Sequence, residues 1–545
     1  MLSAIKKVPK LLLLPALIYF IGFVLLTYPL ITHFSSSFMG DSQDVYQNVW
    51  SLWWFQQAVD SKDLSLWHTN MVFYPQGASL YGHALSPLNG ALAYPLQKFL
   101  DWHQVYNTLI IFNFVATGIS LFWFTHYYIK SWFPSVVAGG LYTFSAYHFL
   151  HSRGHIEMAS MQWLTFFTLS FVWMLDKPSW RKALLSALLL LLTLWNTPYH
   201  LLYAVFIGAI IGGCYGWRLR KNLPKLKELL IVGLQFCFVC LIVLGPSLSS
   251  YSYHTATQMF ARAHDPKENS VEVFHYLARP DGYLGEITKD YWPKLLESPG
   301  FSESQVRLHF ASLVLAGVAL LGLKKDYRVG IWLLVGSAFL LLSLGPIFLY
   351  RGYPLTLNGR WVEISLPYAW LEKIVPPLKL SGVPARMGVM PLMAACLLAG
   401  FGLESLLRQK KRIIITVLLA LGVLEAIPKT ITPLAVSVPE RVTYLASLSP
   451  GGLLDLAHKP PLALYYQIFH RKPLTTGYLS RISLSNSKYL GALTKAQETN
   501  NFWLLCTTYQ VKYLWTNNQI GKLKPILEDQ NTFLYDLKPQ NICVN

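Results

Sequence analysis

Charged residues are scarce in this sequence. Asp, Glu, Lys and Arg make up only 13% of its 545 residues, and 53% are hydrophobic, whereas a soluble globular domain carries about 25% charged residues. This composition argues against a water-soluble protein. Runs of about 20 residues with almost no charge, such as 11–30 and 200–217, are long enough to cross the roughly 30 Å hydrocarbon core of a bilayer. The sequence therefore predicts a polytopic α-helical membrane protein.

Cysteine is also rare, and its spacing does not match a metal site. The six cysteines mostly lie in apolar runs, and the Cys237-x-x-Cys240 pair lies inside one of them, where packing explains it better than redox chemistry. Cys506 and Cys543 could form a disulfide in an oxidising compartment. The sequence also lacks a Walker motif, a dinucleotide-binding motif and any internal repeat of 20 to 50 residues.

The apolar runs predict about eleven transmembrane helices, and an odd number places the two termini on opposite sides of the membrane. The first run follows three lysines and lacks a small-x-small cleavage site, so it predicts an uncleaved helix and not a signal peptide. The approximate bounds, each to within several residues, are 11–30, 105–127, 134–150, 158–175, 183–196, 200–217, 229–248, 307–323, 330–349, 387–406 and 413–427.

The charges between these runs set the orientation. With the N-terminus inside, only four of the 27 acidic residues lie on the cytoplasmic side: Asp176, Glu228, Asp326 and Glu404. The short cytoplasmic segments instead carry Lys6, Lys7, Lys10, Lys130, Lys177, Arg181, Lys182, Arg218, Arg220, Lys221, Lys225, Lys227, Lys324, Lys325, Arg328, Arg408, Lys410, Lys411 and Arg412. This positive-inside pattern predicts a cytoplasmic N-terminus and an extracytoplasmic tail. It also explains the net charge of +18 without a nucleic acid partner.

Four long segments are predicted on the outer side. Three are loops, at 31–104, 249–306 and 350–386, within a transmembrane domain of residues 1–427. Loops of this length are usually functional. The fourth is the tail, 428–545, which has no run of spanning length and predicts a small extracytoplasmic α/β domain. Its strand-like runs, separated by Pro, Gly and Asn turns, are 452–457, 464–469, 502–507, 509–516 and 532–537.

The first outer loop contains the strongest candidate for chemistry. Asp41 and Asp44 lie three residues apart at the start of a helix-compatible stretch, so both carboxylates can project from one face near the membrane surface. Nearby Trp and Tyr side chains would raise the pKa of such a carboxyl group and let it act as a base on a hydroxyl. The same spacing equally fits Asp41 as an N-cap and Asp44 as an N3 acid. Capping and catalysis do not exclude each other.

Further along this loop, Tyr74 and His83 are polar residues among turn formers. An ordered interfacial loop explains them at least as well as direct catalysis does. We count both as candidate substrate contacts.

Basic and polar residues at two other outer positions are candidate ligands for the substrate. In the turn His151-Ser152-Arg153-Gly154-His155-Ile156-Glu157, Arg153 could meet a phosphate, and His155 and Glu157 could orient an acceptor. A capped, solvated turn is the competing interpretation, and a metal site is disfavoured because the turn is not helical. Arg360 and Arg386 could bind a phosphate bidentately, although Arg386 fits snorkelling to headgroups equally well.

The order of these elements resembles the GT-C superfamily, the membrane glycosyltransferases that use polyprenyl-phosphate sugars. Its relatives include protein mannosyltransferases, the aminoarabinose transferase of lipid A and YfhO-like membrane proteins. The similarity spans nearly the whole chain and is carried by short elements: Gly40-Asp41-x-x-Asp44, Phe73-Tyr74-Pro75-Gln76-Gly77, Gly154-His155-Ile156-Glu157, Val383-Pro384-Ala385-Arg386, and Tyr465-Tyr466-Gln467 with Gly477 to Arg481. The superfamily often has adjacent acids in the first loop, whereas Ser42 and Gln43 separate them here. The choice between Asp41 and Asp44 as base therefore stays open.

The resemblance implies transfer of a hexosyl or pentosyl group, with inversion, from a polyprenyl-phosphate carrier to an extracytoplasmic glycan, lipid or protein acceptor. It places the protein in the cell envelope, in a bacterial inner membrane, with membrane lipids as its surroundings. No cofactor is required by this chemistry, although a divalent cation is compatible with it. A lipid or glycan transporter or flippase, or a non-catalytic membrane component, are the alternatives. A transporter would favour ionisable residues at helix centres, which we do not find.

Overall fold

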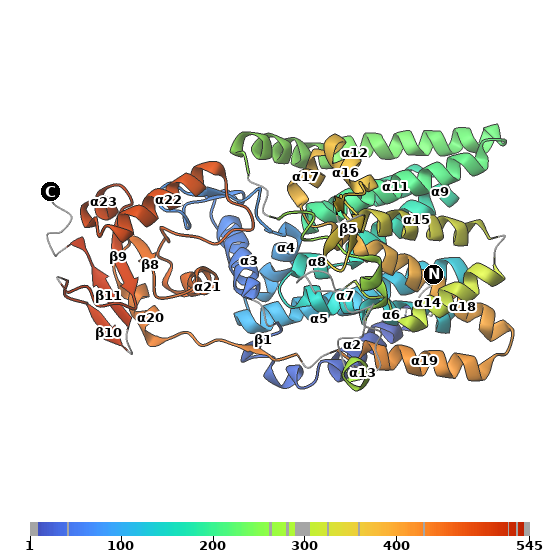
Figure 1. Cartoon of the computed structure of the whole chain (residues 1–545), viewed down its shortest axis with the longest axis horizontal. Helices are drawn as coiled ribbons and strands as arrows, with labels where there is room; N and C mark the ends of the chain where they lie inside the picture. The colour runs from blue at the N-terminus through green and yellow to red at the C-terminus, as the bar shows by residue number, and fades with distance from the viewer. Residues whose placement is uncertain are drawn as a thin grey trace. The chain divides into compact units, whose positions relative to one another are not determined.

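The computed structural model describes residues 9–40, 43–260, 264–278, 283–288, 306–323, 326–357, 360–428, 431–521, 523–529 and 532–538. It forms two compact units. Unit 1 comprises Met1–Phe34, Asn107–Pro246 and Arg262–Pro433, and unit 2 comprises Ser35–Tyr106, Ser247–Ala261 and Leu434–Asn545. These units cut across the predicted division at residues 427 and 428, because most of the first outer loop, from Ser35 on, belongs to the same compact unit as the tail (Figure 1).

Unit 1 is built mainly of apolar helices, and each of the predicted runs contains a helix. Their bounds are α2 (Leu14–Leu26), α5 (Trp102–Ile129), α6 (Trp132–Thr143), α7 (Ala146–Ser152), α8 (Ile156–Ala159), α9 (Gln162–Asp176), α10 (Trp180–Asn196), α11 (Pro198–Leu219), α12 (Leu223–Gln258), α13 (Tyr283–Thr288), α14 (Phe310–Gly322), α15 (Tyr327–Ser343), α16 (Pro367–Ile374), α17 (Pro376–Ser381), α18 (Val389–Arg408) and α19 (Arg412–Ala426). The first residues of α5 and the last turns of α12 belong to unit 2.

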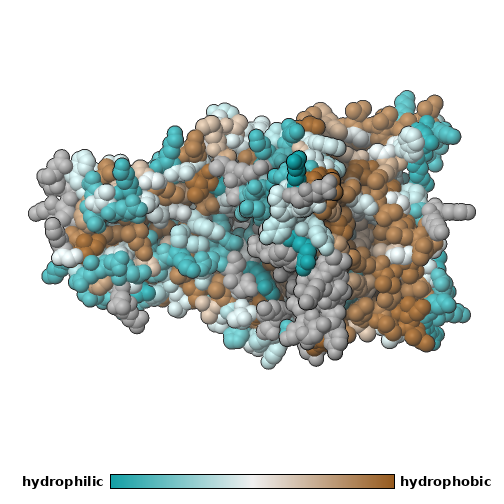
Figure 2. Space-filling view, in the orientation of Figure 1, coloured by the Kyte–Doolittle hydropathy of each residue, from teal (hydrophilic) through white to brown (hydrophobic). Residues whose placement is uncertain are grey.

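Within the described residues, five segments are long and apolar enough to span a membrane: Trp102–Ile129, Ile156–Asp176, Pro198–Leu219, Leu223–Thr257 and Pro384–Arg408. The remaining apolar helices are shorter, so the figure of about eleven spans stays a prediction. Hydrophobic side chains cover much of the visible surface over α14, α18 and α19 (Figure 2). The chain is an integral membrane protein.

Helix α18 forms the centre of unit 1, and nearly all of its side chains are buried. It crosses α14 closely at Gly402, where an added Cβ would lie only 1.8 Å from the carbonyl oxygen of Leu315. Small residues let membrane helices approach in this way. Short 3-10 turns precede or connect these helices: η2 (Leu30–His33), η3 (Val273–Leu277) and η6 (Pro384–Gly388), with a π-helical turn, η1 (Pro9–Leu13), before α2.

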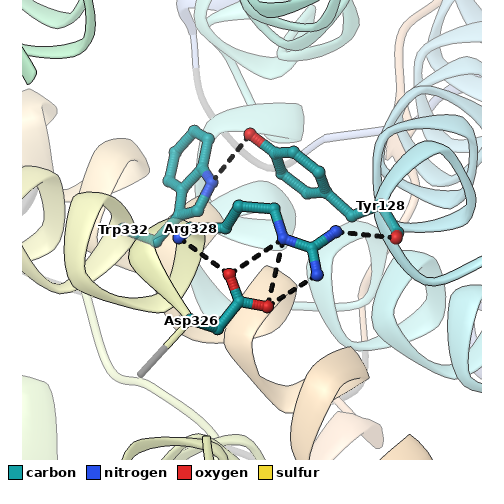
Figure 3. A network of polar contacts seen from close by, with 4 residues as sticks. All are labelled: Tyr128, Asp326, Arg328 and Trp332. Atoms are coloured by element: carbon teal, nitrogen blue, oxygen red, sulfur yellow. Dashed lines mark hydrogen bonds and ion pairs between the residues drawn. The ribbon is translucent and has the colours of Figure 1, made fainter. Parts of the chain in front are cut away.

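A polar network fastens the end of α5 to the start of α15 (Figure 3). The Arg328 guanidinium donates to both oxygens of the Asp326 carboxylate, at 2.6 to 3.1 Å, and to the carbonyl oxygen of Tyr128 at 2.9 Å. The Trp332 indole donates to the Tyr128 hydroxyl at 3.4 Å. This end carries the residues predicted to be cytoplasmic, so the network serves to hold helix ends together there.

Unit 2 contains a mixed sheet with helices around it. The strand order is β10-β11-β9-β8, with β8 and β9 parallel and the other pairs antiparallel. The elements of the tail are β7 (Leu434–Ala435), α20 (Glu440–Ser447), β8 (Gly452–Asp455), α21 (Pro460–His470), α22 (Leu484–Glu498), α23 (Phe502–Thr507), β9 (Val511–Thr516), β10 (Leu527–Asp529) and β11 (Thr532–Asp536).

Two of the predicted strands are wrong, because residues 464–469 and 502–507 lie in helices α21 and α23. Both helices have local start signals that the apolar pattern masks. Helix α21 begins with Pro460 and Pro461, residues that suit the first helical turn. Helix α23 is capped by Asn501, whose side chain accepts the backbone N–H of Leu504 at 3.0 Å.

The first outer loop supplies the rest of unit 2: β1 (Ser37–Phe38), α3 (Asp44–Asp60), β2 (His68–Thr69), β3 (Ala78–Ser79) and α4 (Pro87–Leu96). Gln467 ties this loop to the tail. Its amide donates to the carbonyl oxygens of Met71 and Lys472, and its Oε1 accepts the Trp50 indole N–H at 2.7 Å. Strand β1 also pairs with β7.

The cysteines follow the predicted pattern as far as the described residues reach. Cys214, Cys237, Cys240 and Cys396 are free, so the Cys237-x-x-Cys240 pair is not oxidised. Cys506 is disulfide-bonded. Cys543 lies outside the described residues.

Candidate active site

Asp44 is the first residue of α3, and the residue before it, Gln43, takes the N-cap position. The interpretation of Asp44 as an N3 acid is therefore wrong, because the helix begins two residues later than that role requires. The Tyr478 hydroxyl donates to Asp44 Oδ1 at 2.9 Å. Burial, together with the charge of Asp44, raises the pKa of Tyr478 to about 12, so this hydroxyl stays protonated and donates at neutral pH. Asp41 lies outside the described residues.

His83 lies inside unit 2 and is engaged at both ring nitrogens. Nδ1 accepts the backbone N–H of Ser480 at 3.3 Å and lies 3.1 Å from the Gln47 amide, and Nε2 lies 3.0 Å from the Ser51 hydroxyl. Burial lowers the pKa of His83 to about 3, so the ring is neutral. Its role in the described structure is to join α3 to the tail segment around Ser480.

Tyr74 also contacts the tail within unit 2. Its hydroxyl donates to Gln510 Oε1 at 2.8 Å, and its carbonyl oxygen accepts the Tyr489 hydroxyl at 2.5 Å. The backbone N–H of Tyr74 donates to Leu474 O at 2.9 Å. These contacts fix the loop that carries Tyr74 against the sheet.

In unit 1, the polar turn from His151 to Glu157 connects α7 to α8. Hydrogen bonds from the next residues anchor it to α5, since the Ser160 hydroxyl and the Gln162 amide both donate to Asn113 Oδ1, at 3.1 and 2.8 Å. Glu157 is 4% exposed, and its carbonyl oxygen accepts the Asn196 amide at 2.8 Å. Arg153, His155 and Glu157 therefore belong to a turn that is buried in the helical unit and not simply solvated.

Arg386 is buried next to this turn, at 6% exposure, in η6 just before α18. The Tyr147 hydroxyl donates to its carbonyl oxygen at 2.9 Å, and the Tyr147 ring lies 4.3 Å from the ring of His151. The guanidinium lies 4.8 Å from the centroid of the Tyr199 ring. Arg386 is therefore held inside the protein and does not simply snorkel to headgroups.

The position of Arg386 depends on a glycine before it. Gly382 ends α17 with a φ of +66°, a conformation that glycine adopts without strain. An added Cβ there would meet the carbonyl oxygen of His264 at 2.3 Å. A glycine at position 382 is therefore needed for the path of the backbone that leads to Arg386.

Sequence reasoning missed part of this cluster, which we call the Arg386 cluster: Tyr147, Asn196, Tyr199, His200 and Arg386 with the His151 to Glu157 turn. Asn196 lies between Glu157 and His200, since its amide is 3.4 Å from His200 Nδ1. A signal was available in Trp195-Asn196-Thr197-Pro198-Tyr199-His200, a polar break between two apolar runs at the same predicted side as Glu157. From hydropathy alone, this polar break indicates only a junction between two helices.

Arg360 is exposed on a small sheet of unit 1 formed by β4 (Leu349–Tyr350), β5 (Tyr353–Leu357) and β6 (Arg360–Val362). The structure does not bring it into the contacts that define the Arg386 cluster. Within the described ranges, His, Cys, Asp and Glu side chains form no group of three placed to hold a metal ion.

Comparison with known proteins finds a similar fold. No protein-family model matches the sequence, and no curated protein matches it. The Archaeoglobus fulgidus oligosaccharyltransferase tethered with an acceptor peptide aligns with a TM-score of 0.51 at 10% identity, over 94% of this chain and 70% of that one. Its apo form aligns with a TM-score of 0.50 at 9% identity, over the same shares.

ArnT from Cupriavidus metallidurans, bound to undecaprenyl phosphate, covers 96% of this chain and 97% of its own at 10% identity, but the TM-score of 0.39 is too low to support an argument. The two oligosaccharyltransferase structures establish the fold alone. At that level this chain is similar in fold to the Archaeoglobus fulgidus oligosaccharyltransferase.

Proposed function

We propose that this chain is a GT-C type membrane glycosyltransferase that moves a hexosyl or pentosyl group from a polyprenyl-phosphate carrier to an extracytoplasmic glycan, lipid or protein. The observation that carries the proposal is the Arg386 cluster, a buried guanidinium within a unit of apolar helices. A lipid phosphate is an anion that reaches such a site from the membrane, and a guanidinium binds it bidentately.

The proposed reaction is a single displacement. The acceptor oxygen forms a bond to the anomeric carbon while the bond from that carbon to the phosphate oxygen breaks, which inverts the centre. The acceptor proton passes to a first-loop carboxylate, and the phosphate leaves with the bonding electrons. Arg386 stabilises the charge on that phosphate, with Arg153 as a second candidate contact.

We assign the base to Asp44. Tyr478 donates to its Oδ1, which fixes the orientation of the carboxylate at the start of α3. His155 and Glu157 are the candidate acceptor contacts in unit 1, and Tyr74 and His83 hold the loop that carries Asp44. The proposed orientation has the N-terminus in the cytoplasm and unit 2 outside, as the positive-inside pattern indicates.

The test compares Asp44→Asn with Asp60→Asn. Both aspartates belong to α3 and both accept a tyrosine hydroxyl, Tyr478 and Tyr94 respectively. We expect Asp44→Asn to lower kcat by about 100-fold or more, because a general base contributes roughly 10² to 10⁴. Asp60→Asn should leave turnover unchanged. The readout is transfer by the purified full chain from a panel of polyprenyl-phosphate sugars, alongside profiling of cell-surface glycans.

The remaining outcomes are informative. Full turnover by Asp44→Asn, or loss of turnover in Asp41→Asn alone, would overturn the assignment of Asp44. Arg386→Lys keeps the charge but loses the planar fork, so we expect it to raise KM for the donor about tenfold or more. Movement of the lipid-linked sugar across proteoliposomes without any transfer would instead identify a flippase.

A further inference from the structure

Two side chains with unused polar groups, His458 and Arg441, lie against Trp515 in the tail of unit 2, and a third, Tyr466, lies against His458. The His458 ring packs edge-on against the Trp515 ring, with centroids 4.8 Å apart, and against the Tyr466 ring at 5.0 Å. The Arg441 guanidinium lies 5.8 Å from the centroid of Trp515. These residues come from four elements: α20, the turn after β8, α21 and β9. We call them, with Asp455, the Trp515 cluster.

Asp455 orients His458. The carboxylate accepts the backbone N–H groups of Ala457 and His458, and its two oxygens lie 3.0 and 3.1 Å from His458 Nδ1. The carboxylate is fully buried and the imidazole is 9% exposed. Nδ1 is therefore a donor, and Nε2 has no hydrogen-bond partner among the residues that the structure describes. Asp455 thus fixes the orientation of the His458 ring and leaves Nε2 available to a ligand.

Arg441 has one engaged and one unengaged edge. Its Nη1 donates to Thr532 Oγ1 at 3.1 Å and lies 3.4 Å from the Asp529 carboxylate. Its Nε is buried and lacks an acceptor, and no described residue accepts from Nη2. The edge formed by Nε and Nη2 matches a carboxylate bidentately. A buried donor without an acceptor is unfavourable, so a ligand oxygen there would be stabilising.

The cluster also lies where ligands bind in related topologies. Strands β8 and β9 are parallel, and Asp455 and Trp515 are partners at their carboxyl ends. In open α/β sheets, ligands bind in the crevice outside the carboxyl ends of the strands. The geometry points to a binding site at this edge for a carboxylate-bearing sugar. Arg441 would hold the carboxylate, and His458 Nε2 and the Tyr466 hydroxyl would contact sugar hydroxyls.

The ligand class follows from the groups present. A guanidinium with an unengaged planar edge, an imidazole acceptor and a phenol favour a carboxylate attached to a polar ring over a neutral sugar. The other charged or titratable groups near His458 are Asp455 and, beyond it, His470, Lys472 and the Asp529 partner of Arg441. The inference rests on the proposed function only in taking the ligand to be a glycan. Its test needs neither donor nor turnover, so the two can fail separately.

Binding is measured with the full chain in nanodiscs, by calorimetry and saturation-transfer NMR, using methyl glucuronide, methyl glucoside and inorganic phosphate. We expect the glucuronide to bind and the glucoside to bind at least tenfold more weakly. Arg441→Gln should weaken glucuronide binding about tenfold or more, whereas Lys495→Gln, an exposed change in α22, should not. Inorganic phosphate should bind more weakly than the glucuronide.

His458 Nε2 accepts from a sugar hydroxyl, so His458→Phe, which keeps the ring packing but loses this acceptor, should weaken binding of the glucuronide severalfold. Arg441→Lys, which keeps the charge near Asp529, covers the case in which Arg441→Gln does not fold, and it should weaken binding similarly because it lacks the planar edge. Equal affinity for the glucuronide and the glucoside, tighter phosphate binding, or unchanged binding in both Arg441 variants would overturn the proposal.

Discussion

Unit 1 and unit 2 bury polar side chains in different ways. In unit 1, the Arg307 and Glu425 side chains form an ion pair at 3.0 Å, and the carboxylate also accepts the first backbone N–H groups of α14. This pair joins the start of α14 to the end of α19. In unit 2, by contrast, Gln467 holds main-chain groups of segments almost 400 residues apart in sequence. In unit 2, the buried polar contacts of Gln467 join segments that are far apart in sequence.

The comparison predicts that the largest loss of stability follows from breaking the ion pair. Glu425→Ala leaves the Arg307 charge buried at 4% exposure, which costs about 3 to 5 kcal/mol. The measurement is thermal unfolding of the purified chain in detergent. Arg307→Leu combined with Glu425→Leu should recover much of the loss, because both charges are then gone. A double variant as unstable as the single one would show that the pair is not the cause.

The next largest effect is expected in unit 2. Gln467→Leu leaves the Trp50 indole N–H and the Lys472 carbonyl oxygen without the partners that Gln467 supplies, at a cost of about 1 to 3 kcal/mol for a buried group. Hydrogen exchange should accelerate in α3 and α21 while unit 1 stays protected. Gln519→Leu, at an exposed position of the same unit, is the control. Uniform acceleration in both units would contradict the distinction between them.

Acid should also destabilise unit 2 through its buried histidines. Burial lowers the pKa of His83 and of His470 to about 3, below the usual value of about 6.5. The unfolded chain therefore binds more protons between pH 6.5 and 3, so stability falls as the pH falls through this window, by up to about 1.4 kcal/mol per pH unit for each histidine. His83→Gln should flatten this slope in hydrogen-exchange measurements on unit 2. An unchanged dependence of stability on pH in His83→Gln would contradict this prediction.

The smallest effect is expected at the end of α18. Arg408 and Glu404 form an exposed i, i+4 ion pair at 2.9 Å, in which the arginine side chain is 75% exposed. Such pairs contribute about 0.3 to 0.5 kcal/mol. Glu404→Gln should therefore leave the unfolding temperature almost unchanged, and a large shift would mean that this carboxylate has a role beyond the pair.

The two units also differ in how far the sequence predicts them. In unit 1 the apolar runs locate helices, closely for 183–196 and α10 but ten residues short of the end of α12 for 229–248. Run 158–175 is divided between α8 and α9, and run 134–150 between α6 and α7, where Ser145 caps the second helix. In unit 2, the apolar patterns of α21 and α23 predicted strands, although Pro460, Pro461 and Asn501 are local signals for the start of a helix. The association of the first loop with the tail has no local signal at all, because it depends on Gln467, Trp50 and Met71 meeting in space.

The candidate site shows the same limits. Hydropathy and charge indicate that Arg153, His155, Glu157 and Arg386 lie at one predicted side of the membrane, and the structure places them in or beside one buried turn. Asn196 and Tyr199 were missed because neither is ionisable near neutral pH. His83 was chosen for its chemistry, and the structure gives it protein partners at both nitrogens.

The interleaved course of the chain has a consequence for synthesis. Residues 35–106 belong to unit 2, but their partners in the tail begin only at Leu434, after the whole of 107–433 has been made. At roughly 5 to 20 residues per second, the first loop waits for between about 15 and 65 seconds. During that interval Trp50 lacks the tail residue, Gln467, that accepts its indole N–H. Newly made protein should therefore need a chaperone or the membrane surface to shield this aromatic helix until translation ends.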